Sequence, residues 1–249
     1  MLSLFATAVS GSLNGLKINS ATFRRWYYRR LTRVLGLRVI TRGVQSIAKP
    51  QLVVSNHISY FDIVALGSVI AGDFIAKADI AKWPIFGIMA KAGRSVFIDR
   101  RRSATSNARD QIQERLDAGD TLIMFPESTS GDGNHVKTFK SALFTVAERH
   151  VTDAQGQTRA VAVQPVSMAY TRLNGLPLGV GWRPYVAWYG DMELVPHLWR
   201  IAKLGTITVE ITFHPSVMPS EFTSRKALAA HCDQVVRRGM AQLLAGRTA

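Results

Sequence analysis

The segment LVVSNHISYFD, residues 52–62, decides the fold. It opens with a short apolar run that follows Lys49-Pro50-Gln51, a pattern typical of a buried β-strand. Polar residues come next, with His57 and Asp62 five positions apart. Because α/β folds place reactive groups in the loops that follow their strands, this transition predicts an α/β protein with a functional site after the strand.

Short apolar runs and helical stretches alternate along the rest of the chain. We expect strands at 52–55, 74–76, 95–98, 121–125, 160–167 and 206–213, and helices at 61–70, 84–91, 104–117, 140–150 and 224–246. This order predicts an α/β fold with a mostly parallel or mixed central sheet flanked by helices. We expect residues 44–249 to form this domain and residues 1–43 to form a separate segment.

Residues 1–43 contain no Asp or Glu. Apolar residues recur there with helical spacing, and arginines line another face; the residues are Phe23, Trp26, Tyr27, Leu31, Val34 and Leu35, then Arg25, Arg29 and Arg33. Such a segment is typical of an amphipathic helix that docks on a membrane. The alternative is a surface helix packed on the core. Residues 1–16 lack the basic start of a signal peptide, so none is expected.

The composition excludes several classes of protein. The chain has 249 residues, 47% of them hydrophobic, which excludes a disordered chain. Its single cysteine, Cys232, excludes a disulfide framework and a cysteine-ligated zinc site. The chain contains no run of about 18 apolar residues, so we expect no membrane-spanning helix. The net charge of +14 indicates an anionic partner: a nucleic acid, a membrane surface or a phosphorylated substrate.

His57 and Asp62 form a candidate acid–base pair. Histidine is the usual general base of enzymes, and a carboxylate can fix its tautomer. Five residues turn through about 500° on one ideal helix, so His57 must precede the helix for the side chains to meet. Two structural alternatives remain open. Ser59-x-x-Asp62 is a capping-box pattern, and His57 can be an ordinary loop histidine.

Three further polar clusters follow predicted strands. Residues 93–102 end in three arginines, whose planar forks suit phosphate oxygens. Residues 125–130 place Glu127 and hydroxyl side chains before a glycine-containing loop, which suits a polar headgroup. Lys137 and Lys140 come shortly afterwards. The alternatives are a solvated charge run for the arginines and a turn cluster for residues 125–130.

In order and spacing these clusters resemble the glycerolipid acyltransferase family, which includes bacterial 1-acylglycerol-3-phosphate acyltransferases. Asn56, His57 and Asp62 match the family's NHxxxxD block. The remaining matches cover three more blocks and two isolated positions: Gly93 with Phe97 to Arg100, Phe125 to Glu127 with Thr129, Val163 with Pro165 and Val166, and Lys77 and Pro84. The resemblance covers about residues 40–215. Ser128 departs from it, because the family usually has a glycine there.

Two stretches resemble one branch of that family, the lyso-ornithine lipid acyltransferases. They are residues 125–144 and residues 169–173 together with 188–191. This branch acylates the hydroxyl of a lysolipid that carries an amino-acid headgroup. The resemblance therefore leaves two acceptors open, a lyso-ornithine lipid and 1-acylglycerol-3-phosphate.

The resemblance implies an O-acyltransferase of membrane lipid biosynthesis, with acyl-ACP or acyl-CoA as donor and no metal or other cofactor. His57 would be the base and Asp62 would orient it. The implied substrate-binding residues are Asn56, Lys77, Gly93, Arg100, Arg101, Glu127, Ser128, Thr129 and Lys140. We expect peripheral attachment to the anionic cytoplasmic face of a bacterial inner membrane.

Other classes are less favoured. A nucleic-acid-binding protein fits the charge, but no recognised binding module is present. A hydrolase could use the same His57–Asp62 pair with water, although the chain has no G-x-S-x-G motif of serine hydrolases. A non-catalytic membrane scaffold would not need the intact pair.

Overall fold

A computed structural model describes residues 21–77, 95–98, 106–152 and 158–247. An eight-stranded mixed sheet runs through its centre, with the order β1-β10-β8-β2-β5-β3-β4 and β9 paired to β8. The strands are β1 Leu37–Gly43, β2 Gln51–Ser55, β3 Asp73–Lys77, β4 Val96–Ile98, β5 Thr121–Met124, β8 Ala162–Leu173, β9 Leu176–Pro177 and β10 Ile207–Phe213. The predicted α/β class with a mixed sheet is confirmed.

Five neighbouring strands run in one direction. β8, β2, β5, β3 and β4 pair in parallel along the sheet. β10 is antiparallel to β8, and β1 is parallel to β10, so this edge of the sheet runs the opposite way. A small second sheet pairs β6 (His150–Thr152) with β7 (Thr158–Ala160).

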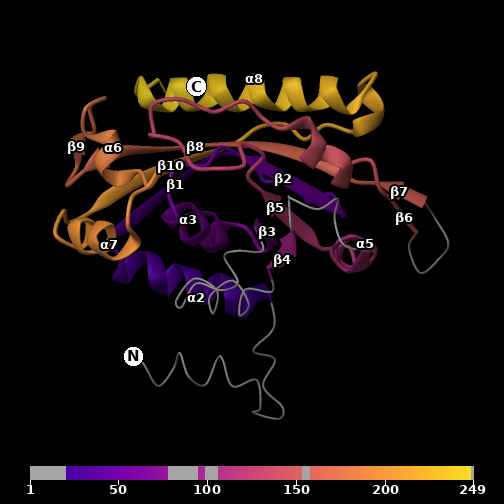
Figure 1. The fold of residues 1–249 in the computed structure, drawn as a ribbon, viewed down its shortest axis with the longest axis horizontal. Helices are drawn as coiled ribbons and strands as arrows, with labels where there is room; N and C mark the ends of the chain where they lie inside the picture. The colour runs from indigo at the N-terminus through magenta and orange to yellow at the C-terminus, as the bar shows by residue number, and fades with distance from the viewer. Residues whose placement is uncertain (1–20, 78–94, 99–105, 153–157, 248–249) are drawn as a thin grey trace, which may run out of the picture.

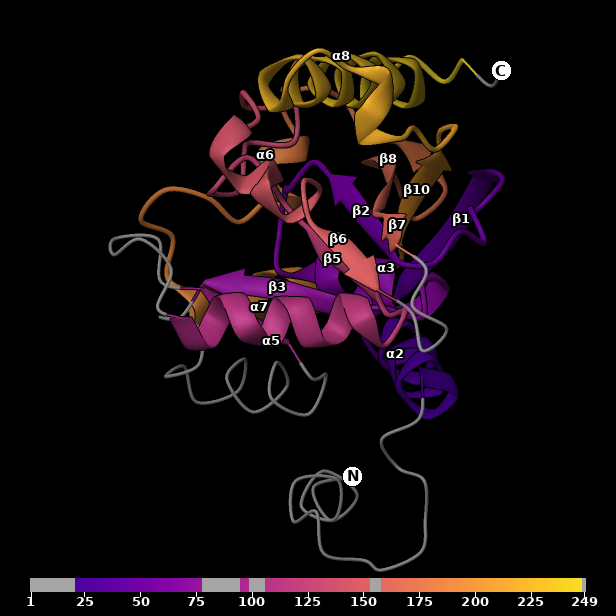
Figure 2. The ribbon, with the colours of Figure 1, turned by 90° about the vertical axis from the view of Figure 1, so that its right-hand side faces the viewer.

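Helices cover both faces of the sheet. α8 (Arg225–Leu244) lies along one face, and α2 (Ala21–Val34), α3 (Phe61–Val69) and α5 (Ser106–Asp117) lie on the other (Figures 1 and 2). Two short helices, α6 (Arg183–Val186) and α7 (Leu194–Ala202), lie at the β9 end of the molecule (Figure 1). The 3-10 turns are η2 (Ser141–Val146) and η3 (Pro219–Glu221).

The apolar runs become buried strands because the sheet is covered on both sides. Every residue of β2 and of β5 is buried, so these strands read as continuous apolar runs rather than alternating ones. α3 is also buried on nearly all sides, between the sheet and α2. The two helices approach closely at Gly67, where a Cβ would lie 2.5 Å from Cδ2 of Tyr28.

The prediction for residues 1–43 is only partly right. A helix does form over Ala21–Val34, but residues 37–43 are strand β1, which pairs with β10. Gly36, with φ of 67°, ends the helix in the left-handed conformation that favours glycine. The β-branched run Val39-Ile40-Thr41 then favours a strand. The segments 1–43 and 44–249, predicted as separate, thus share one sheet.

The helix α2 turns a different face to the core than the spacing predicts. Among the side chains whose burial is described, Tyr28 and Thr32 are buried, whereas Trp26 and Val34 are exposed. From the predicted apolar face, Tyr27, Leu31 and Leu35 pack partly buried against the core. Tyr28 packs edge-on against Phe74 with ring centroids 6.4 Å apart. α2 is therefore a surface helix packed on the core, as the alternative expects, and its docking on a membrane stays a prediction.

One other predicted helix differs from the structure, and a second cannot be compared with it. Residues 140–150 form only the 3-10 turn η2, because β6 already begins at His150 and pairs with β7. The predicted helix 84–91, including Pro84, lies outside the described residues. In the part of the chain that the structure describes, no helix has both the length and the apolar character needed to span a bilayer.

Candidate active site

The loops after β2 and β5 meet at one edge of the sheet. β2 and β5 are parallel neighbours, so their carboxyl ends lie together. The backbone N–H of His57 in the first loop donates to Oε1 of Glu127 in the second, at 2.8 Å. In return the N–H of Gly131 donates to the carbonyl of His57, also at 2.8 Å. These bonds lock the two motif-bearing loops together.

His57 and Asp62 form the predicted pair. His57 lies in the loop before α3, and Asp62 lies in the first turn of that helix. Nδ1 of His57 is 2.8 Å from Oδ2 of Asp62. This geometry confirms the expectation that the histidine precedes the helix.

Asp62 is fully buried and held by several donors. Its Oδ2 also accepts the backbone N–H groups of Ile58 at 2.6 Å and Ser59 at 2.9 Å. Its Oδ1 accepts the hydroxyl of Tyr170 at 2.6 Å. The carboxylate therefore ties down the start of α3 and orients the histidine at once, so the capping and catalytic interpretations of Asp62 are compatible.

The carboxylate decides which nitrogen of His57 is basic. A carboxylate can only accept, so Nδ1 of His57 carries the hydrogen and Nε2 keeps its lone pair. The ring stacks on Phe125, with centroids 4.2 Å apart and planes at 14°, and its side chain is 21% exposed. His57 is thus oriented on two sides while part of it stays accessible, which is what a general base requires.

Tyr170 is a site residue that the sequence analysis did not single out. It lies on β8 and is buried, and burial together with the nearby Asp62 raises the pKa of its phenol well above the usual value. The hydroxyl therefore stays protonated and donates to Asp62. Only the tertiary fold brings Tyr170 to Asp62, because β8 pairs with β2, the strand that leads into the loop of His57.

Glu127 is a buried positioning residue. Its Oε1 accepts from His57, its Oε2 accepts the backbone N–H of Lys137 at 2.7 Å, and the residue is 3% exposed. Burial raises the pKa of its carboxyl to about 8, against the lowering effect of the two N–H donors. Glu127 joins three loop segments; its predicted contact with substrate stays a prediction.

Of the two lysines named after this loop, Lys137 contacts it through its side chain, and the predicted substrate binding of Lys140 stays a prediction. Nζ of Lys137 donates to Oγ1 of Thr129 at 3.1 Å and to the carbonyl of Ser130 at 2.7 Å. Lys140 is exposed, and its backbone N–H donates to the carbonyl of Pro126 at 2.9 Å. Thr129 is exposed beside Lys137, so a hydroxyl and an ammonium group stand together at the surface of the loop.

Ser128 has a positive φ of 72°. This left-handed conformation is easy for glycine and costly for a residue with a Cβ. The glycine that the resemblance leads us to expect at this position is therefore explained by backbone geometry. Ser128 is half-buried, and its predicted part in substrate binding stays a prediction.

Asn56 braces the site from behind. It is buried; its Nδ2 donates to the carbonyl of Met168 at 2.9 Å, and its Oδ1 accepts the N–H of Met168 at 2.9 Å. This pairing fixes the loop after β2 to the neighbouring strand β8. Direct contact between Asn56 and substrate stays a prediction.

The other predicted site residues follow β3 and β4. Lys77 is the last residue of β3, and β4 ends at Ile98, at the same edge of the sheet as His57 because these strands are parallel. Gly93, Arg100 and Arg101 lie outside the described residues. Within the described residues, no group of three or more His, Cys, Asp or Glu side chains is placed to hold a metal ion.

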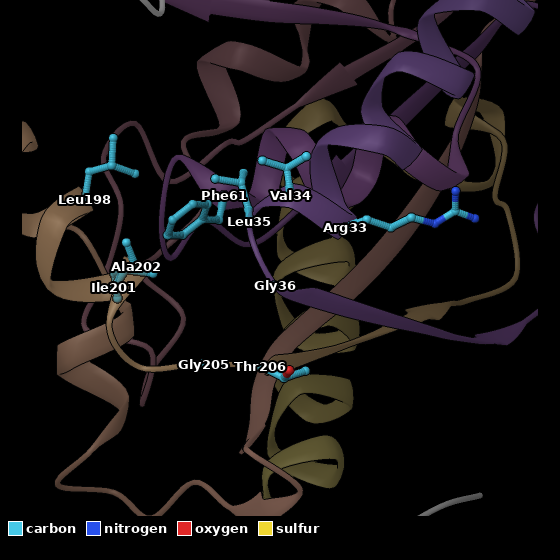
Figure 3. A pocket seen from close by; sticks show the side chains of 10 residues that line it. All are labelled: Arg33, Val34, Leu35, Gly36, Phe61, Leu198, Ile201, Ala202, Gly205 and Thr206. Carbon is cyan, nitrogen blue, oxygen red and sulfur yellow. The ribbon is translucent and has the colours of Figure 1, made fainter. Parts of the chain in front are cut away.

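A cavity lies between α7 and the end of α2, with Phe61 at one wall (Figure 3). Its volume is about 330 Å³, and its lining is mixed: apolar side chains come from Val34, Leu35, Phe61, Leu198, Ile201 and Ala202, and polar ones from Arg33 and Thr206. Phe61 immediately precedes Asp62 in the chain. One wall of the cavity therefore comes from the first turn of α3, the turn that also carries Asp62.

Comparison with known proteins agrees with this geometry. The profile of the family described as Acyltransferase matches residues 32–169. A lyso-ornithine lipid O-acyltransferase of Brucella abortus is 42% identical over 93% of this chain and 88% of its own. A second, from Rhizobium meliloti, is 37% identical over 90% of this chain and 78% of its own. The chain belongs to the acyltransferase family, and it is an O-acyltransferase.

Two further relatives define the breadth of the similarity. A 1-acyl-sn-glycerol-3-phosphate acyltransferase of Neisseria gonorrhoeae is 31% identical over 75% of this chain and 68% of its own. The crystal structure of the 1-acyl-sn-glycerophosphate acyltransferase PlsC of Thermotoga maritima superposes with a TM-score of 0.65 at 22% identity, covering 97% of this chain and 87% of its own. The PlsC structure shares the fold.

Proposed function

We propose that this O-acyltransferase moves a fatty acyl group from a thioester to the free hydroxyl of a lysolipid, and that a lyso-ornithine lipid is its preferred acceptor. The support for this acceptor is the similarity to proteins named lyso-ornithine lipid O-acyltransferase, of which two are 42% and 37% identical over nearly the whole chain. The donor we propose is acyl-ACP or acyl-CoA, and the reaction needs no metal or other cofactor.

One observation carries the mechanism: Nδ1 of His57 faces a buried carboxylate at 2.8 Å, which leaves Nε2 as the base. Nε2 takes the proton of the lysolipid hydroxyl while the alcohol oxygen attacks the thioester carbonyl carbon. Asp62 holds the ring and stabilises the imidazolium that forms. The tetrahedral intermediate then collapses, the carbon–sulfur bond breaks, and the imidazolium returns its proton to the thiolate.

We assign the substrates to the edge of the sheet around His57. Arg100 follows β4 and would pair with an anionic group of the acceptor, beside Lys77 at the end of β3. Thr129 and Lys137 supply a hydroxyl and a cation at the loop surface. The cavity between α2 and α7, whose lining is partly apolar, offers space for part of a lipid chain.

We further propose that the protein attaches peripherally to the cytoplasmic face of a bacterial inner membrane. The acceptor and the product are lipids, so the site must meet a bilayer. The exposed side of α2 supplies Trp26, with the Arg30 guanidinium 5.3 Å from its ring centroid, and Arg33. Aromatic and cationic side chains together suit an anionic membrane interface.

The test is acyl transfer by purified protein with acyl-ACP or acyl-CoA and detergent-dispersed lyso-ornithine lipid. Wild-type protein should form the diacylated lipid, and His57→Ala should lower turnover by at least about 10²-fold while the protein still folds. Asp62→Asn should also be severe, because an amide can hold the wrong tautomer. A His57→Ala protein with near-normal turnover would disprove the mechanism.

A second acceptor, 1-acylglycerol-3-phosphate, is favoured by the Neisseria gonorrhoeae relative. Competition between the two lysolipids at equal concentration decides between them: a larger kcat/KM for 1-acylglycerol-3-phosphate would contradict the preference that we propose. Release of free fatty acid in place of diacylated lipid, with acceptor present, would instead identify a hydrolase.

A further inference from the structure

The apolar side of the helix α7 is wider than the part that the protein buries. His197 and Ile201 are buried against the rest of the protein. Val195 and Trp199 are four residues apart on another face, and they are 72% and 67% exposed. Because an amphipathic helix normally buries its apolar side, these two exposed side chains are apolar surface that the protein itself does not cover. The outer face of α7 therefore has the character of a surface that another apolar phase covers.

The short helix α6 extends this surface. Trp182 and Tyr185 are both exposed, and their rings lie 5.2 Å apart. Arg200 of α7 joins the two helices: its guanidinium lies 5.3 Å from the ring centroid of Tyr185. At the end of α7, Nζ of Lys203 lies 5.0 Å from the ring centroid of Trp199.

The inner side of the same helix pair is fixed to the catalytic loop. The hydroxyl of Tyr60 lies 2.9 Å from Nδ1 of His197 on α7. The backbone N–H of Trp188, just after α6, donates to the carbonyl of Ile58 at 3.0 Å. Tyr60 and Ile58 both lie between His57 and Asp62 in the sequence. The exposed face of α6 and α7 is thus one layer of side chains away from the site.

We propose that this surface, the α6–α7 patch, is a second membrane-docking surface, and that its occupant is the interface of an anionic bilayer. It consists of Trp182, Tyr185, Val195, Trp199, Arg200 and Lys203. The inference rests on the proposed function in one respect, that the acceptor is a membrane lipid. It adds a docking surface in the second half of the chain, on the side of the cavity opposite α2.

The chemistry of the patch favours a bilayer. Trp and Tyr have an apolar ring with a polar group, which suits the zone between headgroups and acyl chains. Arg200 and Lys203 complement an anionic leaflet, and each can add about fivefold to binding. Asp191 and Glu193 precede α7, whereas Lys203 follows it, so the acidic and basic charges lie at opposite ends of the helix.

The cavity supports the same orientation. Leu198 and Ala202 of α7 face Val34 of α2 across it (Figure 3). Both helices that border the cavity therefore carry an exposed aromatic residue, Trp199 on one and Trp26 on the other. A bilayer that met both helices would also meet the cavity between them.

The test measures binding of the full chain to phosphatidylglycerol vesicles and to phosphatidylcholine vesicles. The variant Trp182→Ser/Val195→Ser/Trp199→Ser should lower the partition onto phosphatidylglycerol vesicles by at least about tenfold, with residual binding through α2. Lys203→Gln should lower it about fivefold on anionic vesicles and not on neutral ones. Unchanged binding of both variants would overturn the proposal.

The matched control is Val44→Ser/Ile47→Ser, which removes side chains that are 82% and 94% exposed. The start of β1, at Leu37, pairs with Ile207 of β10, shortly after α7. The end of β1, at Gly43, pairs with Phe213 at the other end of β10. Val44 and Ile47 follow Gly43, so the control positions lie at the end of the sheet away from α7. The control should bind vesicles as wild type does. If it loses as much binding as the patch variant, general surface hydrophobicity explains the effect and the proposal fails.

A second readout uses only conservative aromatic substitutions, which should leave the fold intact. In wild-type protein, brominated phosphatidylglycerol should quench tryptophan emission, and Trp182→Phe/Trp199→Phe should lower that quenching and leave the part that comes from Trp26 on α2. Quenching that stays unchanged in this variant would overturn the proposal. The acyl carrier protein is the other occupant to distinguish: patch variants that bind vesicles normally but lose turnover only with acyl-ACP would assign the patch to the donor instead.

Failure of the proposed function gives a different result. If wild-type protein acylated no lysolipid in detergent, the function would fail, while vesicle binding would still decide whether the patch docks. In detergent the patch variants should keep wild-type turnover, because the patch contains none of the residues that hold His57.

Discussion

At the scale of single residues, the hydroxyl of Tyr170 completes the set of donors around Asp62. Tyr170→Phe removes that donor and leaves Oδ1 of a buried carboxylate without it. A hydrogen bond to a charged group contributes about 1.5–3 kcal/mol, so we expect kcat to fall by roughly 10- to 100-fold. The KM for donor and acceptor should change little, since Tyr170 acts through Asp62.

Steady-state kinetics of Tyr170→Phe against both substrates check this expectation. Tyr27→Phe is a matched control, because it removes a tyrosine hydroxyl from α2, outside the site. A Tyr170→Phe enzyme with unchanged kcat, or with a raised KM alone, would contradict the positioning role.

Glu127 gives the protein a pH-dependent stability. The unfolded carboxyl titrates near 4.5, and burial raises its pKa in the folded protein to about 8. Between these values the folded state holds a proton that the unfolded state has released. The free energy of unfolding should therefore fall as the pH rises from about 4.5 to 8, by up to about 1.4 kcal/mol per pH unit from this group.

Denaturant unfolding of wild type and Glu127→Gln at pH 5, 6, 7 and 8 measures that slope. The variant should lose the contribution, so its stability should fall less steeply with pH. The control is Glu148→Gln, whose carboxylate is half exposed beside Arg225 and should leave the wild-type slope intact. Parallel curves for wild type and Glu127→Gln would refute the prediction.

Ser128 takes a left-handed φ of 72° that a glycine would adopt without strain. The strain of a residue with a Cβ there is about 1–2 kcal/mol, and the extra freedom of an unfolded glycine offsets about 0.5–1 kcal/mol. Ser128→Gly should thus be neutral or stabilising by up to about 1.5 kcal/mol. Ser141→Gly in η2 should instead be destabilising. Thermal unfolding of wild type and of both variants measures the two changes in stability.

The same variant tests whether Ser128 selects the headgroup. If it does, the ratio of kcat/KM for lyso-ornithine lipid over 1-acylglycerol-3-phosphate should shift in Ser128→Gly. An unchanged ratio would show that the residue matters to the backbone of the loop alone.

At the scale of elements, the helix α2 shows what periodicity can and cannot predict. The spacing of its apolar residues correctly predicts a helix, but the aromatic ring at Tyr28 and the small Thr32 decide which side is buried. That choice depends on Gly67 of α3, whose missing side chain makes room for Tyr28. No pattern within residues 21–34 carries this information.

Strand β1 and η2 were mispredicted for a related reason. Local signals for β1 are present in the sequence: the β-branched run Val39-Ile40-Thr41 and a glycine, Gly36, that can end the preceding helix. The prediction for residues 1–43 instead follows the basic helical pattern that precedes them. For residues 141–150 the local pattern is helical, and pairing of His150 with Ala160 in the small sheet overrides it. Contacts distant in sequence decide both cases.

The exposed arginines of α2 allow a prediction about membrane binding. Arg29, Arg30 and Arg33 are all exposed, but Nε of Arg29 also donates to the carbonyl of Ser68 at 3.1 Å and holds the helix to α3, so Arg29 is left unchanged. Arg30→Gln/Arg33→Gln should weaken binding to anionic vesicles by about 10- to 30-fold, at about 1 kcal/mol per charge, and high salt should reduce the difference.

Vesicle sedimentation at low and high salt measures this effect, and turnover in detergent should stay at the wild-type level. Arg38→Gln is the control, because Arg38 is exposed on β1 rather than on the helix. A double variant that binds anionic vesicles as tightly as wild type would assign docking entirely to other surfaces.

At the scale of the whole molecule, parallel pairing explains why the candidate site was predictable. Motifs far apart in sequence follow β2, β5, β3 and β4, and parallel neighbours bring the carboxyl ends of those strands to one edge. The pair His57 and Asp62 therefore came from the sequence. Tyr170 and the backbone contacts of Glu127 did not, because they depend on the lateral order of strands and on loop geometry.

The sheet also decides whether residues 1–43 can be separated from the rest. β1 covers the edge of β10, and Tyr28 of α2 fills the space over Gly67. Arg24 of α2 pairs at 2.8 Å with Asp73, a carboxylate that is 2% exposed. Without these residues, a sheet edge, an apolar face and a buried charge would all lose their cover.

A chain of residues 44–249 should therefore fail to give a soluble protein with one cooperative thermal transition, although the sequence predicted this range as a domain. In the full chain, Tyr28→Ala should lower the free energy of unfolding by about 3–5 kcal/mol, as expected for loss of a buried aromatic side chain, whereas Tyr185→Ala on the surface should cost far less. Circular dichroism and size-exclusion chromatography measure both results. A monomeric 44–249 chain that unfolds cooperatively would show that α2 and β1 are an appendage, and that docking alone accounts for their presence.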